Sequence, residues 1–195
     1  MSFQVTPDPV LPEVLHIQPK RHGDDRGWFS EVYHEAAFLR AGVPGRFVQD
    51  NHSRSEHAGT LRGLHFQAPP HAQAKLVRCV SGRILDVVVD VRRCSPTFGW
   101  YTAFELDAAR GYQAYIPEGF AHGFCTLEDG TEITYKVTEY YARECDVGLA
   151  YDDPALGIVW PFPASVLILS RRDRTHPHLA DLADYFPTEF VSVRP

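Results

Sequence analysis

The 195-residue sequence lacks the features that mark several large classes of proteins. Its first residues, MSFQVTPDPVLPEVLHIQP, do not show the positive charge and apolar run of a secretory signal. No apolar run approaches the ~20 residues that a membrane-spanning helix needs. The formal net charge is −6, which argues against a nucleic-acid-binding protein, although a local basic pocket for a phosphate is compatible with it. We therefore expect a cytoplasmic protein with no membrane and no nucleic-acid partner.

Cysteines and cofactor motifs are also scarce. The four cysteines, Cys79, Cys94, Cys125 and Cys145, are widely spaced and form no CxxC pair. This favours buried reduced thiols over a disulfide framework or a zinc knuckle. The sequence has no GxGxxG after a strand, no GxxxxGK followed by Ser or Thr, and no GxSxG elbow. The sequence therefore predicts no cofactor.

The middle of the sequence consists mainly of segments that are predicted to form strands. In RILDVVVDVRR (83–93), side chains alternate between two faces with the period of two of a strand. The Ser81-Gly82 pair before it predicts a tight hairpin turn from the preceding strand over 75–80. Other strand-like runs recur about every ten residues. They cover residues 46–53, 60–67, 100–106, 111–117, 122–127 and 132–141.

Only residues 31–42 and 179–186 look helical, and both lie outside the block of strands. Because strands and helices do not alternate, an α/β fold is disfavoured. The sequence predicts an all-β, antiparallel jelly-roll barrel with a few short peripheral helices. A chain of 195 residues with 44% hydrophobic residues is long enough for one domain over residues 1–195.

Two histidines in strand-like segments, His65 and His122, raise the question of chemistry. Each taken alone is best explained as a hydrogen-bonded core residue, but alternate side chains of a barrel strand point into its lumen. A cupin-type metal site has an HxH pair and a later P-x-G-x-x-H. Residues 117–122 match the second half, whereas His65 is followed by Phe-Gln, so the first half is missing. The HSRSEH segment (52–57) has no zinc-peptidase spacing either. A metal site is therefore disfavoured, and acid–base chemistry or plain binding remains.

Histidine accepts a proton near neutral pH and needs a partner, commonly a carboxylate, to fix its tautomer. Asp86, Asp90 and Asp173 are candidate partners that the residues alone do not separate. On an ideal strand Arg62 points away from His65, so a shared site requires a bulge or a position at the barrel mouth.

Eight segments in order carry a family resemblance. They are GDDRGWFSE (23–31), FVQDNHS (47–53), LRGLHFQ (61–67), QAKLVRCVSGRILDVVVDVR (73–92), SPTFG (95–99), IPEGFAHGF (116–124), YKVTEYY (135–141) and DPALGIVWP (153–161). Together they resemble dTDP-4-dehydrorhamnose 3,5-epimerases of the cupin fold. The match covers a core of about 12–175, and residues 176–195 look like a variable C-terminal extension.

The resemblance implies a metal-free homodimer that inverts C3 and C5 of dTDP-4-dehydro-6-deoxy-D-glucose, giving dTDP-4-dehydro-L-rhamnose in deoxysugar biosynthesis. It also implies catalytic roles for His65 as base, Asp173 as its orienting carboxylate, Tyr135 as proton donor and Lys75 near the oxyanion. The implied substrate-binding residues are Arg26, Glu31, Gln49, Asp50, Asn51, Arg62, His122, Tyr141, Asp146 and Arg172. By the family pattern, Arg26 and Glu31 reach in from the partner subunit.

Three positions depart from the pattern. Arg172 stands where the family usually has Lys, and Tyr151 stands where many relatives carry Trp. The acidic residue expected after YY is Asp146, with Glu144 the less favoured choice.

Other functions also fit part of the sequence. A sibling that epimerises C3 or C5 alone, or uses another nucleotide, shares the same acid–base set. A non-catalytic sugar-binding protein has no need of the whole set, and a metal-dependent cupin oxygenase lacks its HxH here. The sequence therefore favours double epimerisation of a dTDP-sugar.

Overall fold

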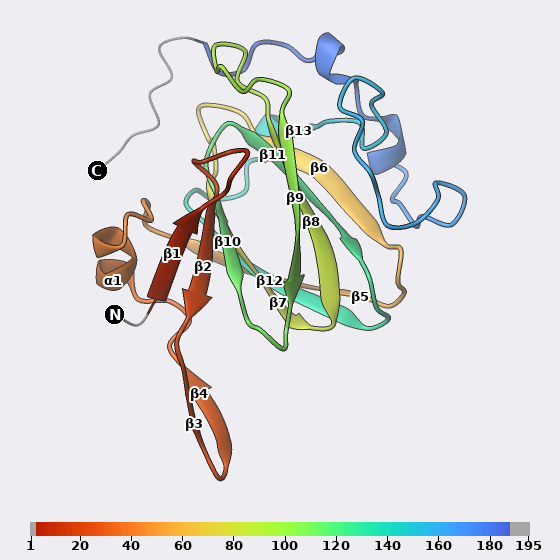
Figure 1. The fold of residues 1–195 in the computed structure, drawn as a ribbon. Coiled ribbons are helices and arrows are strands. Elements are labelled where there is room, and N and C mark those ends of the chain that lie inside the picture. The colour runs from red at the N-terminus through yellow and green to blue at the C-terminus, as the bar shows by residue number, and fades with distance from the viewer. Residues whose placement is uncertain (1–2, 188–195) are drawn as a thin grey trace.

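The protein is a sandwich of two antiparallel sheets, seen in a computed structural model that describes residues 3–187 (Figure 1). The six-stranded sheet has the order β1 (Phe3–Pro7), β2 (Leu15–Pro19), β10 (Gln113–Ile116), β7 (Lys75–Ser81), β12 (Thr131–Val137), β5 (Gln49–Ser55). The five-stranded sheet has the order β13 (Asp146–Gly148), β6 (Leu61–Gln67), β11 (Phe120–Thr126), β8 (Arg83–Asp90), β9 (Tyr101–Asp107). A separate hairpin consists of β3 (Arg21–Asp24) and β4 (Gly27–Ser30) and projects from the body (Figure 1). This is the predicted all-β jelly roll.

The main core lies between the two sheets. Val77 and Ile133 of the six-stranded sheet meet Val88 and Phe124 of the five-stranded sheet there, all of them buried. Burial of such side chains is the largest favourable contribution to folding, at about 1.5–3 kcal/mol for each fully buried side chain. The core therefore holds the two sheets at a fixed distance and orientation, and so fixes the positions of the side chains that point between them.

Strand β8 is buried on both faces. Val88 points between the sheets, while Val87 and Val89 pack outward against Leu149, Leu179, Leu182 and Phe186 from the later part of the chain. Strands covered on both faces read as continuous apolar runs, which explains the unusually hydrophobic VVV of this strand. The segment from 176 to 187, which the sequence suggests is an extension, thus contributes to the core; residues 188–195 lie outside the described residues.

The predicted hairpin at Ser81-Gly82 is wrong. Strand β7 pairs with β10 and β12, whereas β8 pairs with β11 and β9, so the chain crosses from one sheet to the other at this point. Gly82 has φ +75°, and a Cβ there would lie 2.4 Å from Thr131 Oγ1. The Ser-Gly pair does mark a tight corner, but a local turn signal does not reveal which strands pair beyond it.

The two helical predictions are also only partly correct. Within 31–42 the helix α1 covers Glu35–Arg40, capped by the His34 Nδ1, which accepts from Ala37 N–H at 3.2 Å. It packs through Phe38 on the outer face of the six-stranded sheet. Within 179–186 only the 3₁₀ turn η3 (Leu179–Asp181) forms, because packing on β8 decides the backbone there. Two further 3₁₀ turns are η1 (Arg143–Cys145) and η2 (Asp173–Thr175).

No helix among residues 3–187 is long and apolar enough to cross a bilayer.

Candidate active site

A cavity of about 380 Å³ opens between the two sheets. It is lined by every predicted catalytic residue, His65, Lys75, Tyr135 and Asp173, and by the predicted binding residues Arg62, His122, Tyr141, Asp146 and Arg172. Its other lining residues are Ser53, Phe66, Gln67, Gln73, Phe124, Ile133 and Ser170. Side chains from distant parts of the chain therefore converge on one space.

His65 and Asp173 form a hydrogen-bonded pair at the wall of this cavity. The His65 Nε2–H donates to Asp173 Oδ1 at 2.7 Å, and the Asp173 side chain is nearly buried. Burial alone raises the pKa of Asp173, but the hydrogen bond and charge of His65, together with Ser170, outweigh it and hold that pKa below its usual value. The carboxylate is therefore ionised near neutral pH. With Nε2 protonated, Nδ1 of the neutral ring carries the lone pair that can accept a proton.

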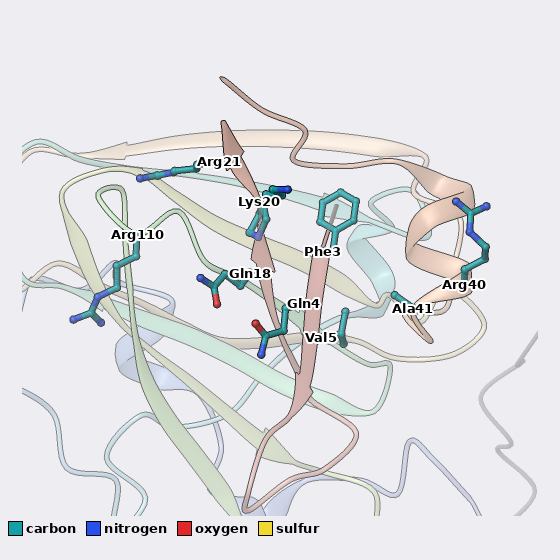
Figure 2. A pocket seen from close by; sticks show the side chains of 10 residues that line it. Phe3, Gln4, Val5, Gln18, Lys20, Arg21, Arg40, Ala41 and Arg110 are labelled. Carbon is teal, nitrogen blue, oxygen red and sulfur yellow. The ribbon is translucent and has the colours of Figure 1, made fainter. Parts of the chain in front are cut away.

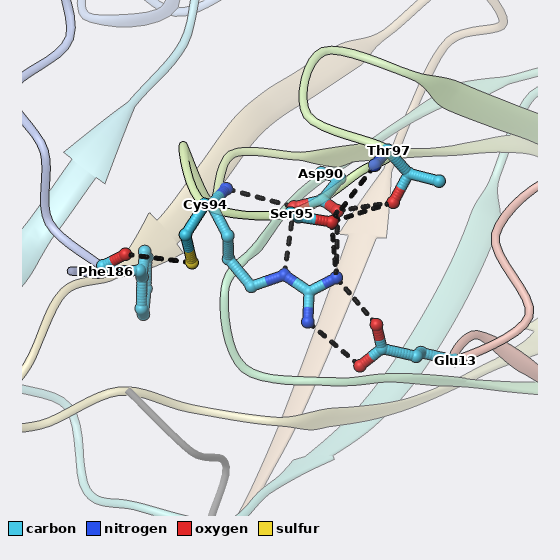
Figure 3. Close-up of polar contacts among 7 residues, drawn as sticks. Glu13, Asp90, Cys94, Ser95, Thr97 and Phe186 are labelled. Atoms are coloured by element: carbon cyan, nitrogen blue, oxygen red, sulfur yellow. Dashed lines mark hydrogen bonds and ion pairs between the residues drawn. The ribbon is translucent and has the colours of Figure 1, made fainter. Parts of the chain in front are cut away.

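The three candidate aspartates have separate partners. Asp86 accepts from His122 Nε2 at 2.9 Å, and its other oxygen, Oδ1, is buried and has no hydrogen-bond partner among the described residues. Asp90 Oδ2 accepts from Arg92 Nη2 at 2.8 Å, Ser95 Oγ at 2.5 Å and Thr97 Oγ1 at 2.7 Å (Figure 3). The same guanidinium reaches Glu13, so Asp90 holds a loop in place. Asp173 is thus the partner of His65, and His122 of the cavity lining forms a second His–Asp pair with the buried Asp86.

A bulge brings Arg62 and His65 to the same cavity. Between β6 and β11, His65 pairs with His122 and Arg62 pairs with Phe124, so three steps along β6 match two along β11. Gly63, within the extra step, has φ +117°, and a Cβ there would lie 2.6 Å from Gly123 Cα. One extra residue reverses the alternation of side chains, which resolves the conflict that an ideal strand would create.

Lys75 and Tyr135 enter the cavity from the opposite sheet. Lys75 lies on β7 and Tyr135 on β12, whereas His65 lies on β6. The Lys75 Nζ donates to the His65 carbonyl at 3.0 Å. Burial lowers the pKa of Lys75 to about 8, against the opposing effects of Asp146 and Asp86. Burial also raises the pKa of Tyr135, so its hydroxyl keeps its proton at neutral pH. The two walls thus carry the predicted base and the predicted proton donor.

Tyr141, Asp146 and Arg172 form a cluster at the rim. Arg172 donates to Asp146 Oδ2 at 2.5 Å and to the Asp146 carbonyl at 3.0 Å, and Tyr141 Oη donates to Oδ2 at 3.1 Å. The planar guanidinium of Arg172 makes both bonds to Asp146 at once. The compact ammonium of a lysine at this position would not reproduce this two-bond geometry. Asp146 lines the cavity and Glu144 does not.

Five predicted binding residues do not line the cavity: Arg26, Glu31, Gln49, Asp50 and Asn51. Gln49 and Asn51 share a strand face with the cavity residue Ser53, whereas Asp50 points to the outer face and pairs with Lys136 at 2.5 Å. Arg26, on the projecting β3–β4 hairpin, pairs with its neighbour Asp24, and Glu31 follows β4 (Figure 1).

His176 is a site residue that the sequence reasoning missed. Its Nε2 lies 3.3 Å from Asp173 Oδ1, and it is not among the residues that line the cavity. The available signal was a histidine three positions after the candidate carboxylate, a spacing that one helical turn brings together. His65, Asp173 and His176 offer ligand atoms within 4.8 Å of one another. Both histidines, however, contact the same carboxylate oxygen at hydrogen-bonding distance, an arrangement suited to holding protons.

A larger open cavity of about 770 Å³ lies beside β1, β2 and α1 (Figure 2). Its charged lining is wholly cationic: Lys20, Arg21, Arg40 and Arg110. Its lining has no carboxylate and no histidine, whereas the smaller cavity has both.

Known proteins match the chain in both sequence and structure. A sequence model of the dTDP-4-dehydrorhamnose 3,5-epimerase family matches residues 9–181. The dTDP-4-dehydrorhamnose 3,5-epimerase of Sinorhizobium fredii is 49% identical over 184 residues, 94% of this chain and 92% of that protein. The Legionella pneumophila 3,5-epimerase, solved with dTDP-4-keto-L-rhamnose, matches with a TM-score of 0.87 at 38% identity, over 93% of this chain and 95% of that one. A 3′-monoepimerase from Streptomyces bikiniensis, solved with dTDP-quinovose, matches with a TM-score of 0.83 at 36% identity, over 90% and 87%.

These matches cover most of this chain and most of each matched protein, so the similarity is not confined to one segment. The chain belongs to the dTDP-4-dehydrorhamnose 3,5-epimerase family of isomerases.

Proposed function

We propose that the chain epimerises C3 and C5 of dTDP-4-dehydro-6-deoxy-D-glucose, forming dTDP-4-dehydro-L-rhamnose for dTDP-L-rhamnose biosynthesis. One observation carries the proposal: a histidine base and a tyrosine acid enter one cavity from opposite sheets, with a buried lysine between the sheets. Inverting a carbon requires a proton to leave one face and another proton to arrive on the other. Groups on opposite walls suit this requirement.

The chemistry begins at His65 Nδ1. It takes the proton from a carbon next to the C4 ketone, and the electron pair of the C–H bond moves to give an enolate with its charge on the C4 oxygen. The buried Lys75 ammonium stabilises that oxygen. Tyr135 then gives its hydroxyl proton to the opposite face of the carbon. Because C3 and C5 both flank C4, the same groups serve both inversions, once His65 has released its proton to solvent and Tyr135 has taken one up.

Substrate binding is assigned to the cationic and polar groups of the cavity and its edge. Arg62 offers a guanidinium that matches diphosphate oxygens, and Arg172, which is paired with Asp146, adds positive charge at the rim. His122, held by Asp86, presents a ring beside the sugar. Gln49 and Asn51 sit on the same strand face as the cavity, and the Gln49 side chain accepts from the Tyr141 N–H at 3.2 Å.

The protein acts as a homodimer in this proposal, with Arg26 and Glu31 of each subunit completing the site of the other. The projecting β3–β4 hairpin supports this, since Trp28 and Phe29 of β4 are 60% and 71% exposed. Large exposed aromatic side chains on an extended hairpin are typical of a contact surface. Sedimentation should give twice the 22.0 kDa of one chain. Asp50 as a nucleotide contact and a cytoplasmic location stay predictions.

Proton NMR in D₂O tests the reaction. The protein is freed of metal with a chelator and incubated with dTDP-4-keto-6-deoxyglucose. Deuterium at both C3 and C5 is the expected result. Deuterium at one carbon only would identify a single-site epimerase, a reaction that the similarity to a monoepimerase keeps as the second candidate. No deuterium, with nucleotide binding intact, would refute the epimerase and favour another nucleotide sugar or a binding protein.

A further inference from the structure

The ring of His176 is packed directly behind the catalytic pair. Its side chain is 7% exposed, and its Nε2 lies 3.3 Å from the same Asp173 oxygen that accepts from His65 at 2.7 Å. The rings of His65 and His176 meet edge to face, with centroids 5.3 Å apart and planes at 88°. One carboxylate oxygen thus faces two imidazole N–H groups.

Gly148 provides the space for this ring. A Cβ on Gly148 would lie 2.1 Å from both Cε1 and Nδ1 of His176, a distance that no packed pair of atoms tolerates. The backbone there does not require glycine, since its φ lies outside the left-handed region. Gly148 is also the β13 residue that pairs with His65 on β6, and Ala150 N–H donates to the Pro177 carbonyl at 2.9 Å. The glycine therefore seats His176 at a fixed place relative to the base.

Burial and the neighbouring His65 lower the pKa of His176, so the ring is neutral near pH 7 and donates one N–H. The charged groups around the pair are Asp173, Arg172 and Asp146, and Lys75 contacts the His65 carbonyl. A second donor on Asp173 restrains rotation of the carboxylate and spreads its negative charge. Its loss would leave that charge concentrated on His65 and would favour the protonated form of the base.

We propose that His176, seated on Gly148, is a positioning residue of the reaction, which holds the Asp173 carboxylate in the orientation and charge state that His65 needs as a base. This rests on the proposed function, because it assigns a support to the base of that reaction.

The test compares His176→Phe with His176→Gln in the full chain. Phenylalanine keeps the ring and removes the donor, whereas glutamine keeps an N–H at about the same reach. His176→Phe should lower kcat by roughly tenfold, as loss of a partner behind a functional histidine typically does. Its KM should stay near the wild-type value, and the acid limb of its pH–rate profile should move to higher pH. His176→Gln should recover most of kcat and the wild-type acid limb.

Gly148→Ala offers an independent route to the same ring. It should reproduce the kcat loss and the shifted acid limb, and in a Gly148→Ala/His176→Phe double variant the two losses should be less than additive, since both act through one contact. Melting temperatures identify any variant that fails to fold, and the remaining folded variants then decide the test. A wild-type pH profile and kcat in a folded His176→Phe, or a fully additive double variant, would overturn the inference. Failure of the proposed function is a separate result, since wild-type protein would then show no exchange.

Discussion

Lys75 carries a charge that its position in the barrel disfavours. Burial lowers its pKa from 10.5 to about 8. A folded-state pKa below the unfolded one means that the unfolded chain binds more protons between those values, so stability rises with pH across that window. Below about pH 8 the cost of keeping the buried ammonium charged is fully present, at about 3 kcal/mol for this shift. The destabilising charge thus lies on Lys75, the residue proposed to stabilise the oxyanion.

Lys75→Met should therefore stabilise the fold while removing activity. Relief of the buried charge, less about 1 kcal/mol for the lost hydrogen bond to the His65 carbonyl, leaves a gain of roughly 2 kcal/mol at pH 7. Urea unfolding at pH 7 and at pH 10 measures it, and the gain should shrink at the higher pH. A destabilised variant at pH 7 would show that the ammonium makes favourable contacts that outweigh its burial.

The roles proposed for His65 and Tyr135, which lie on different sheets, can be tested separately. His65→Asn should lower the rate of deuterium entry into the substrate by at least about 100-fold, a typical contribution of a general base. Its nucleotide affinity should stay nearly unchanged. Tyr135→Phe should still allow removal of the proton but impair inversion. Deuterium NMR of recovered substrate and product distinguishes the two. Normal exchange in the first variant, or normal turnover in the second, would reassign that role.

At the scale of elements, the bulge in β6 decides which residues share the cavity. Gly63→Ala combines a left-handed φ of +117° with a backbone contact at 2.6 Å from Gly123 Cα. We expect destabilisation by more than about 2 kcal/mol and loss of activity as Arg62 and His65 lose register. Gly157→Ala is the matched control, since Gly157 has φ +62° but no atom within 4 Å of the added carbon. Equal losses of unfolding free energy in both variants would show that the close approach is unimportant.

The central strands were predictable because each alternates in hydrophobicity and is bounded by turn residues. The segments 75–80, 83–93 and 60–67 correspond to β7, β8 and β6 with shifts of a few residues at the ends. Strands β1 to β4 and β13 were missed, since all are short and β1, β3 and β4 are largely exposed. The pairing of β7 and β8 was wrong because sheet membership depends on partners far away in the sequence.

The candidate site divides in the same way. Residue types and the family resemblance were enough to select His65, Lys75, Tyr135 and Asp173, which meet in one cavity. Sequence alone offered three aspartates for one histidine, and only geometry assigns Asp173 to His65, Asp86 to His122 and Asp90 to Arg92. His176 escaped notice because it falls where the resemblance ends. Its function depends on a contact with Gly148 that is 28 positions away in the chain.

At the scale of the whole molecule, a mixing experiment tests whether two subunits share each site. Arg26→Ala and His65→Asn should each be inactive alone, because one loses a nucleotide contact and the other the base. If Arg26 acts across the interface, mixed dimers contain one site with both native residues. Unfolding and refolding an equal mixture should then restore about a quarter of wild-type activity, since half of the dimers are mixed and each has one intact site. No recovery, with mixed dimers confirmed by mass spectrometry of differently tagged chains, would place Arg26 in its own subunit's site.

The position of Asp173 and His176 along the chain has a consequence for biosynthesis. Both follow the last described strand, β13, and Leu179, Leu182 and Phe186, which cover part of the outer face of β8, follow them. Since chains are made and folded from the N-terminus, both sheets emerge from the ribosome before the base has its carboxylate. We expect a chain that ends before Asp173 to lack the carboxylate partner of His65 and to leave part of the apolar outer face of β8 uncovered. The last part of the chain to be synthesised thus supplies the carboxylate and also covers that apolar surface.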